Sequence, residues 1–487
     1  MKRKQFIKIA GMATGALALP AWLNTSVSDS LANPGRFKNK LPIPGEIRDS
    51  SFDLTASPAE INLPDGRHLS GFRFNESIPG PTIRQKRGDN VHIRFNNDIG
   101  QDSIIHWHGL IVPSAMDGHP RDVISNGTYN YEFRHNQRAG TYWYHPHPHH
   151  ITGEQVYRGL AGFYFIEDDE EKELNLPDGQ YEIPLIIQDR RVNNSGEIVF
   201  NPSMHERMMT GLLGDLILVN GMPSPYHEVE PGVYRLRILN GSNARIYNLA
   251  FQNGAPFTLI GSDGGLLPEP LEITELLMAP AERADILVDF SEGFDEGTAE
   301  LISKPFDLPS GGRMMGMRNM MRGGPKQGTG FSLMEFRIEG ESHRKPKTLP
   351  GQLSEPNFPV TSSADRTRPI RLAMEMMTGH TINGRQFEME RVDEQVKQGD
   401  TEIWEFINRS NVPHPMHVHA VQFKVLERSG GRGLLPTETG WKDTTLVMPG
   451  ETVRVIMTFD SPKGLYIFHC HNLEHEDNGM MANFEIT

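Results

Sequence analysis

Histidines recur in this sequence at a spacing that suits metal binding. In a β-strand, side chains two residues apart point to the same face and lie about 6.6 Å apart along the chain. A His-x-His motif on a strand therefore aims two imidazoles in the same direction. The sequence contains four such pairs, which are His106/His108, His145/His147, His417/His419 and His469/His471. Together these imidazoles exceed the need of one first-row metal and indicate a cluster of about three metal ions.

The only cysteine lies inside the last of these pairs. Because Cys470 stands between His469 and His471, its thiol points away from both imidazoles on a strand. The cysteine is therefore predicted to serve a different metal, on the other side of the strand. Three further donors lie close by in the sequence, and they are His414, His475 and Met480. A thiolate, two imidazoles and a distant thioether form the ligand set of a blue-copper electron-transfer site.

The sequence repeats itself around these motifs. One segment with alternating apolar residues occurs three times, at 88–96, 232–240 and 399–408. At a fixed distance after it, the outer copies have His106 and His417, whereas the middle copy has Ala250. A second repeated segment occupies 140–147, 297–302 and 464–471, and again only the outer copies contain histidine. Three related units are predicted, of which the middle one is a scaffold without metal.

The remaining sequence indicates an all-β protein built from sandwiches. Period-two alternation is frequent, the 48 glycines and 35 prolines supply many turns, and no long segment has a helical period. Boundaries are expected near 168–178, which is rich in Asp and Glu, and within 340–368, which is rich in Pro and Ser. The predicted divisions are a signal peptide and linker at 1–45 and domains at 46–168, 178–340 and 365–487.

Charge and the N-terminus point to an exported protein. The formal net charge of −14 argues against a nucleic-acid partner. A basic start, Lys2-Arg3-Lys4, precedes an apolar stretch from Ile9 to Leu23 and resembles a twin-arginine signal with Lys4 in place of the second arginine. The general secretory route and a short membrane anchor are the alternatives. We expect a periplasmic or otherwise exported monomer that is not inserted in a membrane after export.

On its four histidine pairs and Cys470, the sequence resembles the three-domain multicopper oxidases over nearly all of the mature chain. The resemblance implies three cupredoxin-like Greek-key β-sandwich domains and four copper ions. It assigns His106 and His417 to the type 2 copper. To the type 3 pair it assigns His108, His145, His147, His419, His469 and His471. The type 1 copper takes His414, Cys470, His475 and, axially, Met480.

The same resemblance implies an activity and two acidic residues that serve it. The family couples one-electron oxidations at the type 1 copper to the four-electron reduction of O₂ to water. Glu476 resembles the family's proton-relay carboxylate, and Asp117 resembles the acidic residue near the water channel of the cluster. A solvated or helix-capping carboxylate is the alternative for both.

Methionine clusters bear on the reducing substrate. One cluster lies among glycines and arginines and contains Met314, Met315, Met317, Met320 and Met321. The second contains Met374, Glu375, Met376 and Met377, and Met204, Met208 and Met209 form a weaker group. Thioethers favour Cu(I) over Cu(II), although methionines more often fill irregular apolar gaps.

These clusters, with segment 259–270, resemble the exported cuprous oxidases of bacterial copper homeostasis. That subgroup often has an Asp and a Met just upstream of the first type 1 histidine, where this chain has Ser410 and Val412. A substrate-copper site is therefore expected from Met374, Glu375 and the loop 311–323. The favoured function is oxidation of Cu(I) by O₂. The alternatives are a laccase-like oxidase of small phenols, a copper-sequestering periplasmic protein, and a copper-free structural protein.

Overall fold

The computed structural model describes residues 36–63, 66, 68–193, 195–294, 297–308, 325–341, 349–375 and 378–487. The predicted signal peptide lies outside these residues. The chain divides into the units Met1–Arg36 and Phe37–Thr487, and the second unit is the subject below. No helix among the described residues is both long and apolar enough to cross a membrane.

The first sandwich packs a four-stranded sheet, β4-β3-β6-β8, against a five-stranded sheet, β2-β5-β10-β9-β7. Its strands are β2 (Glu46–Ile47), β3 (Ser51–Asn62), β4 (His68–Phe74), β5 (Thr82–Lys86), β6 (Asn90–Asn97), β7 (Ile105–His108), β8 (Gly127–Arg134), β9 (Gly140–Pro146) and β10 (Gly162–Glu167). Strand β6 shows why the sequence folds in this way. Its Val91, Ile93 and Phe95 are buried in the core while the side chains between them are exposed.

The middle sandwich pairs a seven-stranded sheet, β13-β12-β11-β15-β20-β17-β18, with a six-stranded sheet, β1-β14-β22-β21-β16-β19. Its first strands are β1 (Asn39–Lys40), β11 (Glu182–Arg190), β12 (Leu216–Val219), β13 (Met222–Pro223), β14 (Pro225–Val229), β15 (Val233–Asn240) and β16 (Tyr247–Phe251). The others are β17 (Phe257–Ser262), β18 (Gly265–Ile273), β19 (Leu276–Met278), β20 (Arg283–Asp289), β21 (Thr298–Ser303) and β22 (Phe331–Ile338). Strand β1 comes from the segment expected to be a linker.

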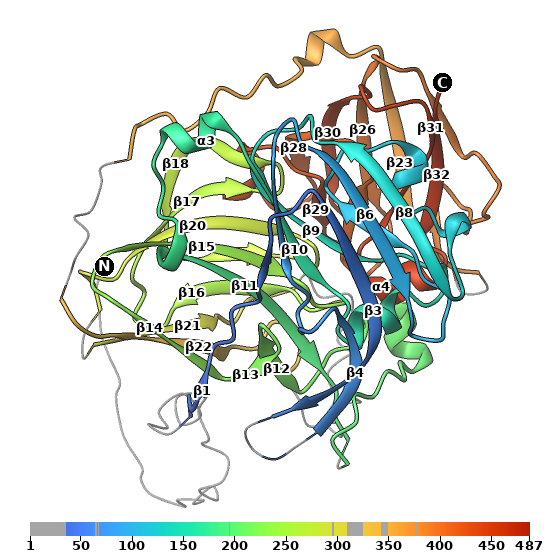
Figure 1. Cartoon of the computed structure of the whole chain (residues 1–487). Helices are drawn as coiled ribbons and strands as arrows, with labels where there is room; N and C mark the ends of the chain where they lie inside the picture. Colours follow the sequence, from blue (N-terminus) through green and yellow to red (C-terminus); the bar gives the residue numbers. More distant parts are fainter. Residues whose placement is uncertain are drawn as a thin grey trace, which may run out of the picture. The chain divides into compact units, whose positions relative to one another are not determined.

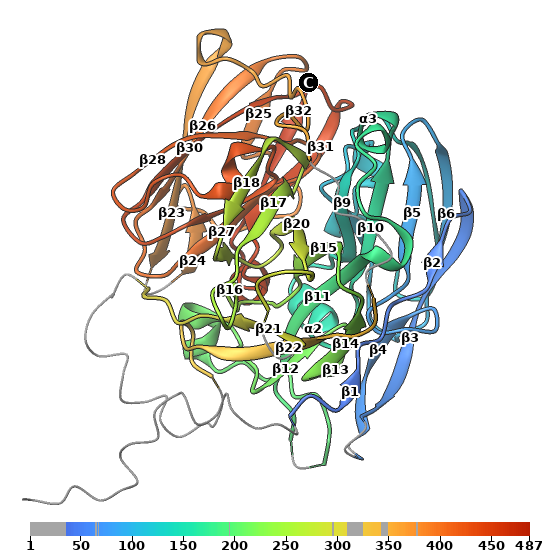
Figure 2. The ribbon, with the colours of Figure 1, turned by 90° about the vertical axis from the view of Figure 1, so that its left-hand side faces the viewer.

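The third sandwich has two five-stranded sheets, β24-β23-β26-β30-β28 and β25-β32-β31-β27-β29. Its strands are β23 (Arg366–Glu375), β24 (Gly379–Ile382), β25 (Glu394–Val396), β26 (Thr401–Asn408), β27 (His414–Val418), β28 (Lys424–Ser429), β29 (Thr444–Val447), β30 (Thr452–Thr458), β31 (Gly464–Cys470) and β32 (Met481–Ile486). Figures 1 and 2 show the three sandwiches in blue to cyan, green to yellow and orange to red.

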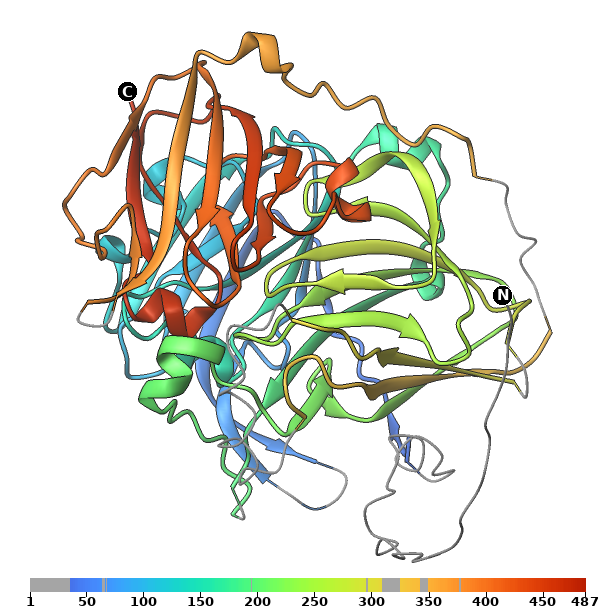
Figure 3. The same cartoon turned by 180° about the vertical axis from the view of Figure 1, so that it is seen from behind.

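Helices are short and lie at connections. Among the described residues the α-helices are α2 (Thr152–Tyr157), α3 (Asp169–Glu173) and α4 (Leu473–Asp477), and η5 (Glu206–Thr210) is a π-helical turn. The 3₁₀ turns are η2 (Ser114–Met116), η3 (Pro120–Asp122), η4 (Gly179–Tyr181), η7 (Thr361–Ser363) and η8 (Pro436–Thr439). The described part of the connection to the third sandwich, 349–365, contains no strand (Figure 3). The predicted all-β fold of cupredoxin-like sandwiches is confirmed.

Strand pairing reproduces the threefold repeat. In each sandwich, the strand of the first repeated segment lies between a parallel and an antiparallel neighbour: β6 between β3 and β8, β15 between β11 and β20, and β26 between β23 and β30. The second repeated segment pairs in the same register three times, as His106 with His145, Ala250 with Ile302, and His417 with His469. The middle sandwich therefore has apolar residues where its neighbours have imidazoles.

Candidate metal centre

All eight paired histidines converge between the first and third sandwiches. Strands β7 and β9 with the residue after β9 present one set of four, and strands β27 and β31 with the residues after them present the other. Every one of these side chains is at most 1% exposed. The antiparallel pairing of the motif strands explains the arrangement, because it sets a histidine of one motif directly opposite a histidine of the other.

The nitrogens that face one another lie at distances that one metal ion can span. The facing pairs are His106 Nε2–His417 Nε2 at 3.3 Å, His108 Nδ1–His145 Nε2 at 3.4 Å, His147 Nε2–His469 Nε2 at 3.3 Å and His419 Nε2–His469 Nε2 at 3.2 Å. Two nitrogens about 2.0 Å from one ion at a tetrahedral angle lie about 3.3 Å apart. Donor groups suited to one ion are His106/His108/His417, His108/His145/His471 and His147/His419/His469. The residues present therefore fit a cluster of metal ions.

In three of these imidazoles, the ring nitrogen Nδ1 donates a hydrogen bond to a backbone oxygen. His106, His145 and His417 turn Nδ1 to the backbone oxygens of Asp117, Pro146 and Asp443 at 2.8, 2.9 and 2.9 Å. A carbonyl oxygen only accepts, so each Nδ1 must carry the proton and each Nε2 keeps its lone pair. Orientation and tautomer are thus set for metal binding.

Burial keeps six of the eight imidazoles neutral, as metal ligation requires. It lowers their pKa far below the ordinary value, and neighbouring imidazoles lower it further. The six are His108, His145, His147, His417, His419 and His471.

Two buried carboxylates touch the histidines. Asp117 Oδ2 lies 2.8 Å from His419 Nδ1, and burial raises the pKa of Asp117. Glu476 Oε2 lies 3.0 Å from His469 Nδ1, and Oε1 lies 3.5 Å from His147 Nε2. Burial opposes ionisation of Glu476, but these two imidazoles outweigh it and lower its pKa. Both carboxylates are 1% exposed, so neither is a solvated surface group.

The side chain of Cys470 is buried in the hydrophobic core of the third sandwich. Its Sγ is 3.4 Å from His414 Nδ1 and 3.7 Å from His475 Nδ1. Met480 is buried in the same core, and its backbone N–H donates to the oxygen of His475 at 3.0 Å. Burial raises the pKa of the Cys470 thiol, so a bound cation is needed to favour the thiolate. The structure thus brings three of the four donors expected at this second site together, and it buries the fourth, Met480, in the same core.

Two further residues, Ser410 and His380, lie beside the histidines of this second site, and the sequence did not single out His380. Ser410 Oγ lies 2.8 Å from His414 Nε2, at a position where the cuprous-oxidase pattern has an acidic residue. The fully buried ring of His380 lies 3.9 Å from that of His475 and 5.4 Å from that of His414. Burial lowers the pKa of His380 to about 4, and the adjoining backbone of Met208 and Arg207 opposes the shift. His380 is a lone histidine outside the repeats, so no spacing could have indicated it.

Only some of the expected substrate-copper residues can be placed. Met314, Met315, Met317, Met320, Met321, Met376 and Met377 lie outside the described residues. Met374 pairs across β23 and β24 with His380, and Glu375 accepts a hydrogen bond from Thr378 at 3.1 Å. Met208 belongs to η5, which contacts α4, and its Sδ accepts from Asn478 at 3.2 Å. Methionines of β23 and η5 therefore lie beside the elements that carry His380 and His475.

Three multicopper oxidase family models match the chain, at residues 55–171, 167–296 and 360–487. With the histidine centre and the three sandwiches, these matches show that the chain belongs to the multicopper oxidase family, whose members use copper, O₂ and a reducing substrate. A laccase of Bacillus subtilis is 33% identical, over 93% of this chain and 98% of its own.

Solved structures agree with this assignment. A multicopper oxidase, McoA, of Aquifex aeolicus shares 39% identity over 92% of this chain and 99% of its own, with a TM-score of 0.83. A multicopper oxidase of Campylobacter jejuni, described as a metallo-oxidase, shares 29% identity over 93% of this chain and 97% of its own, with a TM-score of 0.80.

Proposed function

We propose that the protein is an exported oxidase that takes single electrons from Cu(I) at the Cys470 site and reduces O₂ at the eight-histidine centre. One observation carries the proposal. At the end of strand β31, Cys470 faces His414 and His475. The residues on either side of it, His469 and His471, belong to the eight-histidine centre. An electron that arrives at the thiolate therefore has a short covalent path to the centre.

Copper at these sites supplies one-electron redox chemistry and the binding of O₂. Four donors, His414, Cys470, His475 and Met480, would hold the type 1 ion. His106 and His417 would hold the type 2 ion. The other six paired histidines would hold the type 3 pair, for four ions in all. The apolar core around Cys470 excludes water from the type 1 site.

Reduction of one O₂ to two waters consumes four protons, and two carboxylates are placed to deliver them. Glu476 lies beside His469 and His147, so it can take up a proton and pass it to the centre. Asp117 orients His419 through its carboxylate and His106 through its backbone oxygen. In this proposal Glu476 passes protons and Asp117 both positions imidazoles and stores a proton.

Methionine thioethers near the type 1 site favour Cu(I) as the substrate. Met208 and Met374 lie on elements that adjoin His380 and His475, and thioethers bind Cu(I) in preference to Cu(II). The Campylobacter jejuni structure is described as a metallo-oxidase. The curated relative from Bacillus subtilis is named a laccase, so oxidation of small phenols is the second candidate. Copper sequestration ranks lower, because storage needs no set of eight converging imidazoles.

Removing the thioethers should separate the two candidates. We expect deletion of 313–321, or replacement of Met208, Met374, Met376 and Met377 by leucine, to lower kcat/KM for Cu(I) by about tenfold or more, equivalent to about 1.4 kcal/mol. Oxidation of a small phenol should persist or rise, because the type 1 donors are untouched. Oxygen uptake with each reductant measures both.

Met334→Leu is the matched control, since Met334 is buried in the core of the middle sandwich. It should change neither reaction. If the other variants keep Cu(I) oxidation but lose phenol oxidation, the laccase alternative replaces Cu(I) oxidation as the proposed function.

A further inference from the structure

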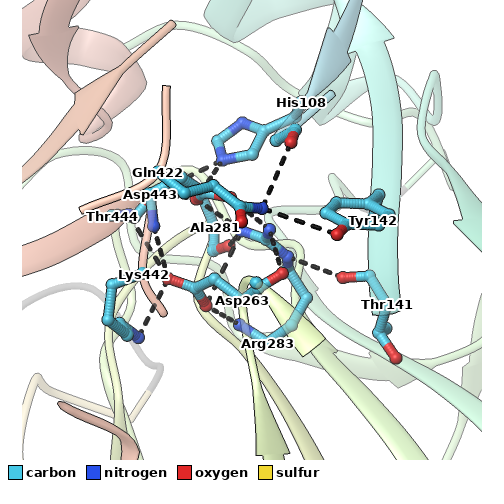
Figure 4. A network of polar contacts seen from close by, with 12 residues as sticks. His108, Thr141, Tyr142, Asp263, Ala281, Arg283, Gln422, Lys442, Asp443 and Thr444 are labelled. Carbon is cyan, nitrogen blue, oxygen red and sulfur yellow. Dashed lines mark hydrogen bonds and ion pairs between the residues drawn. The ribbon is translucent and has the colours of Figure 1, made fainter. Parts of the chain in front are cut away.

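Arg283 of the middle sandwich contacts a residue that lies beside the eight-histidine centre. Arg283 begins β20, is fully buried, and forms a bidentate ion pair with Asp443, which precedes β29 of the third sandwich (Figure 4). Its Nη1 lies 2.7 Å from Asp443 Oδ1, and Nη2 donates to Oδ2. The middle sandwich, which has no histidine at the repeat positions, thus contacts Asp443 beside the eight-histidine centre.

Asp443 in turn contacts two of the paired histidines. Its Oδ1 lies 3.1 Å from His108 Nε2, and its backbone oxygen accepts from His417 Nδ1 at 2.9 Å. The hydroxyl of Thr444 is 3.3 Å from both of these nitrogens and donates to Asp443 Oδ1 at 3.0 Å. Asp443 and Thr444 together therefore hold one ring nitrogen of His108, from the first sandwich, and one of His417, from the third.

Every N–H of Arg283 has an acceptor. Besides Asp443, Nε donates to the backbone oxygen of Thr141 at 2.9 Å, Nη1 to that of Ala281 at 2.9 Å, and Nη2 to that of Asp263 at 3.0 Å. A guanidinium has five N–H donors in a fixed plane, and here their acceptors come from all three sandwiches. A lysine has a single ammonium and cannot reproduce this geometry.

Further buried charges fix the position of this pair. Asp263 accepts from the backbone N–H of Arg283 at 2.8 Å and from those of Asp443 and Thr444, both at 3.3 Å. Lys442 lies 3.0 Å from Asp263 and 2.9 Å from Glu282.

The residue that follows His108 leaves room for the ion pair. A Cβ on Gly109 would lie 2.6 Å from Asp443 Oδ2 and 2.8 Å from Arg283 Nη2, and its φ of +87° also favours glycine. The close approach of Arg283 and Asp443 to the centre thus depends on a glycine.

We propose that Arg283 and Asp443 are positioning residues of the copper centre: Asp443 orients His108 and His417, and Arg283 holds Asp443. The proposal rests on copper binding by these histidines. It gives the middle sandwich a role beyond that of the scaffold predicted from its missing histidines.

Arg283→Lys tests this role, because it keeps a buried cation for Asp443 while removing the planar donors. We expect copper at the eight-histidine centre to bind about 10- to 100-fold more weakly, as is typical when a partner of a metal ligand is lost. The Cu(II) EPR signal of that centre should also change. The blue absorption of the Cys470 site should be unchanged. Competition with a chelator, EPR and visible absorption measure these.

Arg245→Lys is the matched control. Arg245 is also buried and ion-paired in the middle sandwich, 2.8 Å from Asp189, but its other acceptors are the backbones of Gly214 and Pro325. If both variants only lower the unfolding temperature, with copper affinity and EPR signal as in the unaltered protein, the positioning role is wrong.

Asp443→Asn keeps the shape of the side chain and decides the question if Arg283→Lys does not fold. It should weaken copper binding in the same direction. Where Arg283→Lys does fold, the double variant should bind copper no more weakly than the worse single variant, because both act through one contact. Additive losses, or unchanged affinity in Asp443→Asn, would overturn the proposal. The copper content of the unaltered protein tests the proposed function separately.

Discussion

Cys470→Ser is expected to abolish the intense blue absorption and to reduce oxidase activity below detection. The hydroxyl is a poor substitute for a soft thiolate as a copper donor, so the copper–sulfur bond through which electrons would enter the chain at residue 470 is lost. Copper content should fall by one ion per chain. Visible absorption, metal analysis and oxygen uptake measure these outcomes.

The fold should survive this substitution, because a serine for a buried cysteine costs at most about 1–3 kcal/mol of unfolding free energy. Met416→Leu is the matched control, since Met416 is fully buried and is the strand partner of Cys470. It should keep both colour and activity. Retained blue absorption in Cys470→Ser would exclude Cys470 from the site.

Glu476→Gln is expected to keep all copper and the blue absorption but to slow O₂ reduction about 100-fold. The amide can occupy the same space beside His469 and His147 but cannot give up and regain a proton. Oxygen uptake at saturating reductant measures the effect.

Glu474→Gln is a control on the same helix. Glu474 is also fully buried, and burial raises its pKa to about 7, but it accepts from Leu212 N and Asn243 Nδ2 and not from a histidine. This variant should reduce O₂ at the normal rate. A Glu476→Gln enzyme with unchanged turnover would mean that Glu476 is only structural.

Much of the candidate site was predictable because it depends on a local period. Two histidines separated by one residue share a face of a strand wherever that strand lies in the fold, so His106 and His108 could be paired from sequence. The repeat also indicated that the middle copies lack histidine, and the structure then places Ala250 of one copy opposite Ile302 of the other.

Other residues could not be predicted because their contacts exist only after distant segments pack. His380 lies beside His475 through the pairing of β23 with β24 and the packing of η5 on α4. Arg283 and Asp443 are separated by 160 residues, and neither belongs to a motif. A charged residue in a strand is normally exposed, so sequence patterns favour a surface position for Arg283, which is in fact fully buried.

The two halves of the histidine centre come from opposite ends of the described chain. His106 and His417, with facing nitrogens 3.3 Å apart, are separated by 311 residues. Because the sequence has a single cysteine, no disulfide can join the outer sandwiches. Copper shared between them would act as a reversible cross-link, and its binding free energy would add to the stability of the assembled chain. Withdrawal of copper would therefore first loosen the junction of the outer sandwiches, whose separate hydrophobic cores contain none of the eight histidines.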